Sequence, residues 1–276
     1  MRGQKCVITG AASGIGRATA QAAAAQGAVL FLTDLHAEQL EQTVGELRAQ
    51  GATVALAEHF DIANYEAVQA FAQRIHRAHG SVDVVMNIAG ISIWGPVEQL
   101  EHRHWRKTIE VNLMGPIHVI ESFIPEMVRA GKGGHLVNVS SAAGLFGLPW
   151  HAAYSATKFG LRGISEVLRF DLKRHGISVS LVCPGGVATP LVQTVEVVGL
   201  DPARPAVKQL QQRFHKHAVT AEAAAQAILR GIAQKQYMVF TSRDIRVGYW
   251  LQRKFSLPYE LMMRVLNDRL VRAAQG

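Results

Sequence analysis

The chain of 276 residues contains only two cysteines and no long apolar run. Cys6 and Cys183 each lie in an apolar stretch, and neither has a Cys or His at metal-ligand spacing, so we expect two buried, reduced thiols and no metal. No stretch approaches the ~20 apolar residues of a membrane-spanning helix, and Cys6-Val7-Ile8 is too short for the core of a signal peptide. These absences predict a cytoplasmic location.

The chain carries a formal net charge of +8, from 29 Lys and Arg against 21 Asp and Glu. Such a balance can indicate nucleic acid, an anionic membrane or an acidic ligand. However, the segment from Arg243 onward holds seven basic and three acidic residues, a net of +4. Because half of the excess lies in this tail, the rest of the chain is only mildly basic, which argues against a nucleic-acid partner.

Short apolar runs rich in Val, Ile and Leu alternate with longer helical patterns. Such strands are typical of a parallel sheet that is covered on both faces. The sequence therefore predicts a single-domain, doubly wound Rossmann α/β fold, with helices on both faces of a seven-stranded parallel sheet. The expected strands are Cys6–Thr9, Val29–Thr33, Val54–His59, Val82–Met86, Leu136–Ser140, Val179–Cys183 and Tyr237–Phe240.

Two regions depart from this alternation. Residues 190–219 form a long connection with scattered apolar positions, which predicts a substrate lid within a catalytic domain of residues 1–242. Residues 243–276 predict an extension of two amphipathic helices broken near Pro258. We expect these helices to pack on the body or on a sister subunit, and contact with a membrane surface is the less favoured alternative.

A glycine-rich turn follows the first expected strand and leads into the helical run Arg17 to Gln26. Glycines allow the backbone to turn tightly and to approach a pyrophosphate, and the helix N-terminus offers free N–H groups and a positive dipole end. The spacing Gly-x-x-x-Gly-x-Gly is on its own a moderately specific signal. The candidate phosphate-binding residues are Gly10, Ser13, Gly14, Ile15 and Gly16.

Asp34 ends the second expected strand, eighteen residues after Gly16. A carboxylate at this place can accept hydrogen bonds from adenosine-ribose hydroxyls and would repel a 2′-phosphate, which favours NAD over NADP. We expect the nearby Arg17 and His36 to be solvated. The alternative role for Asp34 is the N-cap of a helix starting near Ala37.

Tyr154 and Lys158 are four residues apart in the helical segment Ala152 to Lys173, so they share one helix face. A phenol is a poor base near neutral pH, and a neighbouring cation is expected to lower its pKa. The pair follows a strand that ends in Asn138-Val139-Ser140-Ser141, and active sites of such sheets gather at strand ends of this kind.

Taken together, these motifs closely resemble those of the short-chain dehydrogenase/reductase family, in its common NAD-linked type. The resemblance runs from Lys5 to about Pro190, over two thirds of the chain. It rests on Thr9-Gly10-x-x-x-Gly14-x-Gly16, Asn87-Ile88-Ala89-Gly90, Asn112, Ser141, Tyr154-x-x-x-Lys158 and Pro184-Gly185.

The resemblance implies a catalytic role for four residues. Tyr154 would be the general acid/base, and Lys158 would lower its pKa and hold the nicotinamide ribose. Ser141 would bind the substrate oxygen, and Asn112 would hold a helix kink and a water that links Lys158 to solvent. The alternatives are a capping serine for Ser141 and a core amide for Asn112.

Further cofactor contacts follow from the same resemblance. Asp61 and Ile62 would face the adenine ring, although Asp61 is also a candidate N-cap before Ala63. The remaining contacts are Asn87, Ala89 and Gly90 on the adenosine side, and Pro184, Gly185, Val187 and Thr189 at the nicotinamide carboxamide.

The residues expected around the substrate are bulky and apolar, which favours a steroid-, terpenoid- or lipid-like alcohol or ketone over a sugar. These residues are Ile93, Trp94, Leu145, Phe146, Trp150, Leu191 and Val192. No metal is required, and His135, His151, His175, His215 and His217 are scattered along the chain.

The sequence thus predicts an NAD-dependent oxidoreductase that interconverts a secondary alcohol and a ketone. The alternatives are a non-catalytic NAD-binding regulator and a membrane-surface lipid dehydrogenase. The resemblance also implies a homodimer or homotetramer built on the helices that include Trp105–Arg129 and Ala152–Lys173.

Overall fold

The computed structural model describes residues 1–189, 196–199 and 218–275. Its main sheet has seven parallel strands in the order β11-β7-β6-β4-β1-β2-β3. All seven expected strands are confirmed, with ends that shift by at most two residues. The strands are β1 (Lys5–Thr9), β2 (Val29–Asp34), β3 (Thr53–His59), β4 (Val84–Asn87), β6 (Gly134–Val139), β7 (Ile177–Cys183) and β11 (Met238–Phe240).

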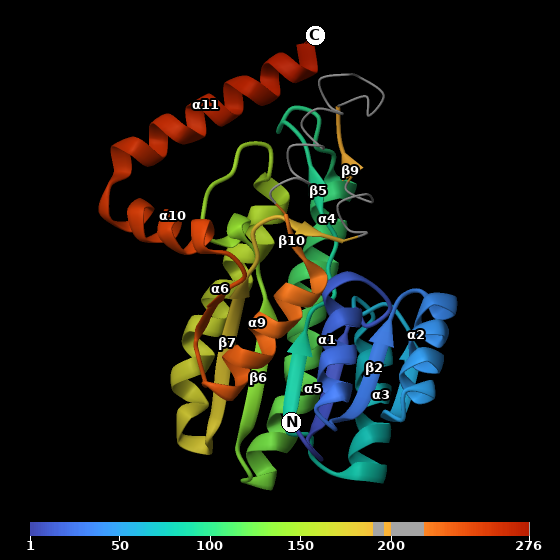
Figure 1. The fold of residues 1–276 in the computed structure, drawn as a ribbon. Coiled ribbons are helices and arrows are strands. Elements are labelled where there is room, and N and C mark those ends of the chain that lie inside the picture. The colour runs from blue at the N-terminus through green and yellow to red at the C-terminus, as the bar shows by residue number, and fades with distance from the viewer. Residues whose placement is uncertain (190–195, 200–217, 276) are drawn as a thin grey trace.

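Helices cover both faces of this sheet (Figure 1). One face carries α1 (Gly14–Ala25), α2 (Ala37–Ala49) and α9 (Ala221–Ala233). The other carries α3 (Tyr65–His79), α5 (Gly115–Ala130) and α6 (Ala152–Asp171), with α4 (His102–Ile109) against α6.

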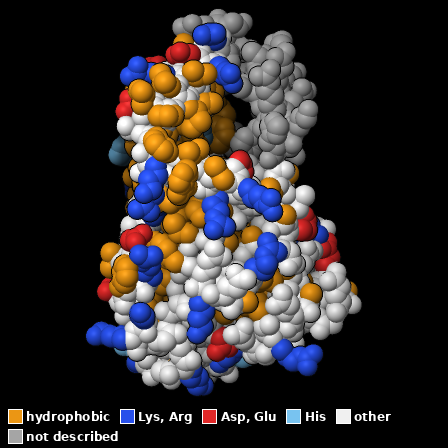
Figure 2. Space-filling model, turned by 60° about the vertical axis from the view of Figure 1, so that its left-hand side comes forward, with side chains coloured by type: hydrophobic (Ala, Val, Ile, Leu, Met, Phe, Trp, Pro, Cys, Tyr) orange, Lys and Arg blue, Asp and Glu red, His pale blue; other side chains and the backbone are white. Residues whose placement is uncertain are grey.

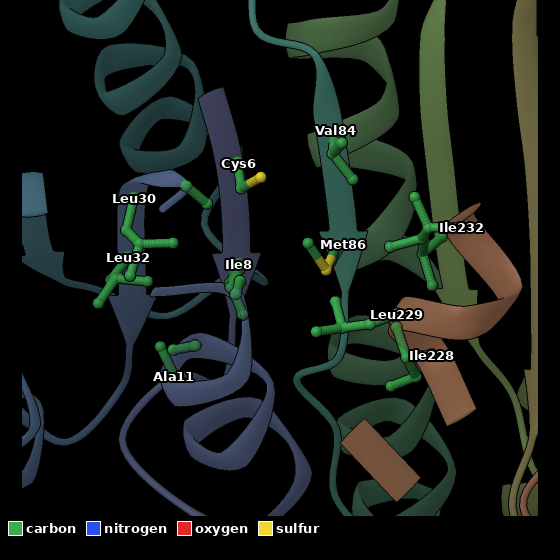
Figure 3. Packing of buried hydrophobic residues seen from close by; sticks show 14 of the residues in the cluster. Cys6, Ile8, Ala11, Leu30, Leu32, Val84, Met86, Ile228, Leu229 and Ile232 are labelled. Carbon is green, nitrogen blue, oxygen red and sulfur yellow. The ribbon is translucent and has the colours of Figure 1, made fainter. Parts of the chain in front are cut away.

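Each sheet face has its own apolar core, because successive side chains of a strand point to opposite faces. On β1, Cys6 and Ile8 join one cluster, whereas Val7 joins the other. Figure 3 shows side chains of α9 packing toward Val84 and Met86 of β4. Both faces are therefore buried, which explains why the strands lack polar alternation.

The direction of the chain through the sheet reverses between β1 and β4. It runs from β1 outward to β2 and β3, then crosses back to β4 on the other side of β1. Ligands of such sheets bind in the crevice at the carboxyl ends of the strands on either side of this reversal. The glycine-rich turn follows β1, and Ile88 to Gly90 follow β4, so both lie at this crevice.

Two pairs of short strands include described residues of the predicted lid. β5 (Ile93–Trp94) pairs with β9 (Glu196–Val197), and β8 (Val187–Ala188) pairs with β10 (Val219–Thr220). The predictions for Leu191, Val192, His215 and His217 lie outside the described residues.

The C-terminal extension consists of the two predicted helices, α10 (Arg243–Lys254) and α11 (Ser256–Gln275). The predicted break near Pro258 is confirmed and lies three residues earlier, at Phe255, which has extended φ and ψ angles. Pro258 lies in the first turn of α11, where a missing N–H costs no intrahelical hydrogen bond.

The inward face of this extension packs on the body, as expected. Tyr249 of α10 accepts a hydrogen bond from Arg162 at 2.8 Å, and Tyr259 of α11 accepts one from the Gly147 N–H at 2.7 Å. The outward face leaves large apolar side chains exposed among Arg and Lys (Figure 2). Contact of this face with a sister subunit or a membrane surface stays a prediction. Among the residues that the structure describes, no helix combines the length and apolar character that crossing a bilayer requires.

The two cysteines are buried and free, on β1 and β7, as predicted. Burial raises the pKa of each thiol to about 12, so both stay protonated and unreactive near neutral pH.

Candidate active site

The glycine-rich turn after β1 has no room for a side chain at Gly10 or Gly16. Gly10 has φ +70°, and a Cβ added there would lie 2.8 Å from the Ala89 Cα. A Cβ on Gly16 would overlap the carbonyl of Gly10. α1 begins at Gly14, and its N-cap residue, Ser13, makes no side-chain cap hydrogen bond. A bare backbone at a helix N-terminus suits the pyrophosphate of a dinucleotide.

The segment after β4 is fixed to this turn through Thr9. The Thr9 hydroxyl accepts hydrogen bonds from the N–H groups of Ile88 (3.0 Å) and Ala89 (3.1 Å). In contrast, the side chain of Asn87 lies inside the protein, where its amide donates to Asn138 Oδ1 at 2.9 Å. Asn87 therefore holds neighbouring strands together, and its contact with a cofactor stays a prediction.

Asp34 lies beside the glycine-rich turn and is buried. One carboxylate oxygen accepts from the Ala12 N–H at 2.9 Å and the other from the His36 N–H at 3.1 Å. The alternative of an N-cap for α2 is wrong, because the cap position belongs to His36. Since each carboxylate oxygen accepts more than one hydrogen bond, Asp34 can still bind ribose hydroxyls.

The surroundings of Asp34 bear on which dinucleotide fits. Arg17 is partly exposed, as expected, and also forms an ion pair with Glu46. Leu35, the next residue after Asp34, is 58% exposed and carries no charge. Neither residue offers a free cation to a 2′-phosphate.

Asp61 and Ile62 differ from each other in exposure. Asp61 is exposed and accepts from the Ala63 N–H at 2.9 Å, whereas Ile62 is buried against α5. The alternative of Asp61 as a helix N-cap is wrong, because α3 starts at Tyr65 and Asn64 caps it. The adenine contact of both residues stays a prediction.

Ser141, Tyr154 and Lys158 come together at the carboxyl end of β6. The Ser141 hydroxyl hydrogen-bonds Tyr154 and also accepts from the Ala143 N–H at 3.1 Å, so it caps a turn as well. Lys158 lies 5.7 Å from the ring centre of Tyr154, and its ammonium donates to the Val139 carbonyl at 3.0 Å. Tyr154 and Lys158 are 9% and 4% exposed, so the phenol and the ammonium are largely shielded from bulk water.

Asn112 joins this group from a π-helical turn, Glu110–Met114, between α4 and α5. Such turns often mark functional sites, and this one is the helix irregularity that the sequence predicted. The side chain exchanges two hydrogen bonds of 2.8 Å with the backbone of Ile91. A Cβ on Gly90 would lie 3.0 Å from Asn112 Oδ1 and 3.5 Å from Lys158 Nζ, so these groups converge at Gly90.

The pKa of Tyr154 differs from the sequence prediction. Burial raises the pKa of its phenol, and the hydrogen bond with Ser141 opposes this rise. Burial also lowers the pKa of Lys158, to about 8. The cause is that a low-dielectric interior disfavours both the phenolate and the ammonium. A neutral phenol beside an ammonium is thus the populated pair near neutral pH.

A cavity of about 510 Å³ lies against this group. Trp94 and Phe146 line it as predicted, and so do several of the predicted cofactor residues: Ile15, Gly90, Tyr154, Lys158, Pro184, Gly185, Val187 and Thr189. The other described candidates lie outside its lining: Gly10, Ser13, Gly14, Gly16, Asp34, Asp61, Ile62, Asn87 and Ala89.

Three predicted substrate residues do not line the cavity. Ile93 is 2% exposed, because strand alternation on β5 turns it away from the side that Trp94 occupies. Leu145 is buried at 1% exposure in the core that α10 covers. Trp150 has φ +66°, and its carbonyl accepts from the Gly95 N–H at 2.8 Å. These three residues are therefore not part of the cavity wall, contrary to the prediction from the sequence.

Sequence reasoning missed two contributions to the cavity. The first is the C-terminal extension, from which Asp244, Ile245, Gly248, Met262, Met263 and Leu266 complete the lining. The helical spacing of Met262 and Leu266 was the available signal, but it did not reveal which surface they cover. The second is His151, counted among scattered histidines although it lies three residues before Tyr154. Within the described residues, no three His, Cys, Asp or Glu side chains are grouped as a metal site requires.

Comparisons with known proteins agree with this geometry. A family model described as short chain dehydrogenase matches residues 4–197. The Mycobacterium tuberculosis protein SadH, named as an oxidoreductase, is 34% identical over 263 residues, which are 95% of this chain and 94% of that protein.

Two solved structures share the fold. A short chain dehydrogenase/reductase from Burkholderia phymatum in complex with NAD has a TM-score of 0.82 at 31% identity, covering 92% of this chain and 94% of that one. An alcohol dehydrogenase from Thermococcus sibiricus complexed with 5-hydroxy-NADP has a TM-score of 0.72 at 26% identity, covering 86% and 95%. The comparisons support a nicotinamide dinucleotide without choosing between NAD and NADP.

Proposed function

The chain belongs to the short-chain dehydrogenase family, and from this premise we propose that it is an NAD-dependent enzyme that interconverts a secondary alcohol and a ketone. The observation that carries the proposal is the convergence of Ser141, Tyr154 and Lys158 on a cavity that begins beside the glycine-rich turn. The bare backbone at Gly10 and Gly16 fits a pyrophosphate, so these residues suit a dinucleotide.

In this proposal the residues divide the proton chemistry among them. NAD, when bound, accepts the hydride from the carbinol carbon. Ser141 holds the substrate oxygen, and Tyr154 takes the hydroxyl proton in oxidation or returns it in reduction. Lys158 supplies positive charge beside the phenol and holds the nicotinamide ribose. Asn112 fixes the backbone of Ile91. The resemblance to the family also gives it the role of holding a water that would link Lys158 to solvent.

The choice of NAD over NADP rests on charge. Asp34 places a carboxylate where the adenosine ribose is expected, and the nearby Arg17 is neutralised by Glu46. A 2′-phosphate would meet repulsion from Asp34 without a compensating cation.

The cavity walls favour an apolar substrate. Trp94, Phe146, Leu148, Met262 and Leu266 present apolar surface around the reacting end. Each buried CH₂ group contributes about 0.8 kcal/mol of binding, or roughly fourfold in affinity. We therefore expect cyclic or long-chain secondary alcohols to exceed sorbitol and xylitol in kcat/KM by at least ~10-fold. Faster oxidation of the sugar alcohols in an NADH absorbance assay would refute an apolar substrate.

We also propose a homo-oligomer built on α6. Val167 and Phe170 of α6 are 57% and 63% exposed, which is unusual for large apolar side chains at a free surface. We expect Val167→Glu to dissociate the oligomer, as light scattering coupled to size-exclusion chromatography would show. Leu257→Glu, on the outward face of α11, is the matched control. If only Leu257→Glu dissociated the oligomer, the interface would lie on the C-terminal extension instead of on α6.

A further inference from the structure

Two aromatic side chains of the cavity wall take no part in the proposed proton chemistry. They are the indole of Trp94 and the imidazole of His151. Their rings stack at 4.3 Å between centres, with 36° between planes. Trp94 comes from β5 and His151 caps α6, so separate elements bring them together.

Trp94 lines the cavity, but its indole nitrogen is not accessible from it. That nitrogen has no accessible surface and no hydrogen-bond partner among the described residues, so a bound substrate does not reach it. Trp94 therefore supplies a packing surface at this part of the wall.

His151 offers the polar group. Its Nδ1 lies 2.6 Å from the Pro149 carbonyl, which can only accept, so Nδ1 carries the hydrogen. Burial lowers the pKa of the ring to about 4, so the ring is neutral at physiological pH. In this tautomer Nε2 is an acceptor, and no hydrogen bond occupies it within the described part of the chain.

The His151 ring is also held near the reacting end. It packs at an angle of 61° to the Tyr154 ring, with 6.3 Å between centres. Packing against Trp94 on one side and Tyr154 on the other fixes its orientation. A group bound here therefore belongs to the same small molecule whose oxygen meets Ser141 and Tyr154.

We propose that His151, held in place by Trp94, forms a second polar subsite that binds an additional hydroxyl of the substrate. A hydroxyl can donate a hydrogen bond to the Nε2 lone pair, whereas a carbonyl or an ether cannot. The substrate class is then an apolar alcohol with a second hydroxyl, or the corresponding hydroxyketone. This inference rests on the proposed function, which it refines.

The test compares diols with monohydric alcohols of the same skeleton. The probes are the 1,2-, 1,3- and 1,4-cyclohexanediols, with cyclohexanol as reference. In the wild-type enzyme with NAD, we expect at least one diol to exceed cyclohexanol in kcat/KM by ~10-fold or more. His151→Phe keeps the stacked ring but removes the acceptor. Trp94→Phe keeps an aromatic ring against His151 and is the matched control.

His151→Phe should bring the diol-to-cyclohexanol ratio close to one through a higher KM for the diol, whereas Trp94→Phe should leave most of this ratio in place. The kcat/KM for cyclohexanol should stay within about threefold, since apolar packing persists. His151→Gln, which restores an acceptor oxygen, should recover part of the ratio. If His151 had only a structural role, its replacement would lower kcat/KM for the diol and for cyclohexanol together, and this result would overturn the subsite. A diol-to-cyclohexanol ratio near one in the wild-type enzyme would also overturn it.

A second measurement separates this subsite from the proposed activity. Calorimetric titration of diol and cyclohexanol into Tyr154→Phe loaded with NAD reports binding without turnover. Tighter diol binding that depends on His151 supports the subsite even if turnover fails, whereas equal binding overturns it. Oxidation of cyclohexanol without any preference for diols would leave the dehydrogenase standing and remove the subsite alone.

Discussion

Replacement of Tyr154 by Phe is expected to lower kcat/KM for alcohol oxidation by a factor of ~10³ while NAD binding changes by less than about threefold. Phe keeps the buried ring and its packing but removes the hydroxyl that hydrogen-bonds Ser141. Proton transfer then has no acceptor in the site. Turnover is followed by NADH absorbance, and NAD binding by calorimetry.

Tyr237→Phe is the matched control for this variant. Its hydroxyl donates to Glu166 at 3.0 Å, away from the cavity beside Tyr154, so its loss should leave turnover unchanged. Residual activity above one tenth in Tyr154→Phe would contradict the role of the phenol. A wild-type protein that binds NAD yet oxidises no alcohol would favour the non-catalytic regulator.

The pKa shifts of Tyr154 and Lys158 predict different pH profiles for alcohol oxidation and ketone reduction. Burial raises the pKa of Tyr154 and lowers that of Lys158 to about 8. Below this value the phenol holds its proton and the ammonium its charge, which is the form that donates a proton in ketone reduction. We therefore expect reduction to be fastest below pH 8 and to fall above it, whereas oxidation gains from rising pH until Lys158 loses its charge.

The fold follows closely from the sequence because its signals are local. Each strand is an apolar run bounded by turn residues. Glycine is required at Gly10 and Gly16 because a side chain at either position would clash with neighbouring backbone. The positions of Tyr154 and Lys158 follow equally, since a spacing of four on a helix fixes their common face.

Other features depend on packing between distant segments. The entry of Met262 and Leu266 into the cavity requires the angle at Phe255, which neighbouring residues do not encode. The pKa of Tyr154 depends on total burial rather than on the Lys158 that is visible in the sequence. The stacking of Trp94 on His151 joins residues 57 positions apart, and only the folded chain reveals it.

Exchange of Asp34 and Leu35 for Asn and Arg is expected to change the preference for NAD over NADP by at least ~100-fold in the ratio of kcat/KM values. The carboxylate of Asp34 repels a 2′-phosphate by about 1–3 kcal/mol per unit charge at ~5 Å, depending on the local dielectric. Asp34→Asn removes this repulsion and weakens binding of the NAD ribose. Leu35→Arg, at an exposed position, then offers the phosphate a cation that pairs with it through two hydrogen bonds.

The variant must be separated from simple damage to the fold, because Asp34 also accepts the N–H groups of Ala12 and His36. Asn keeps one acceptor oxygen, so we expect a loss of about 1–2 kcal/mol in the free energy of unfolding, measured by denaturant titration. Glu38→Gln, in the first turn of α2, removes a nearby carboxylate and should leave the cofactor preference unchanged. If the double variant still preferred NAD as strongly as the wild type, Asp34 would not touch the ribose, and its carboxylate would serve only to join β2 to the glycine-rich turn.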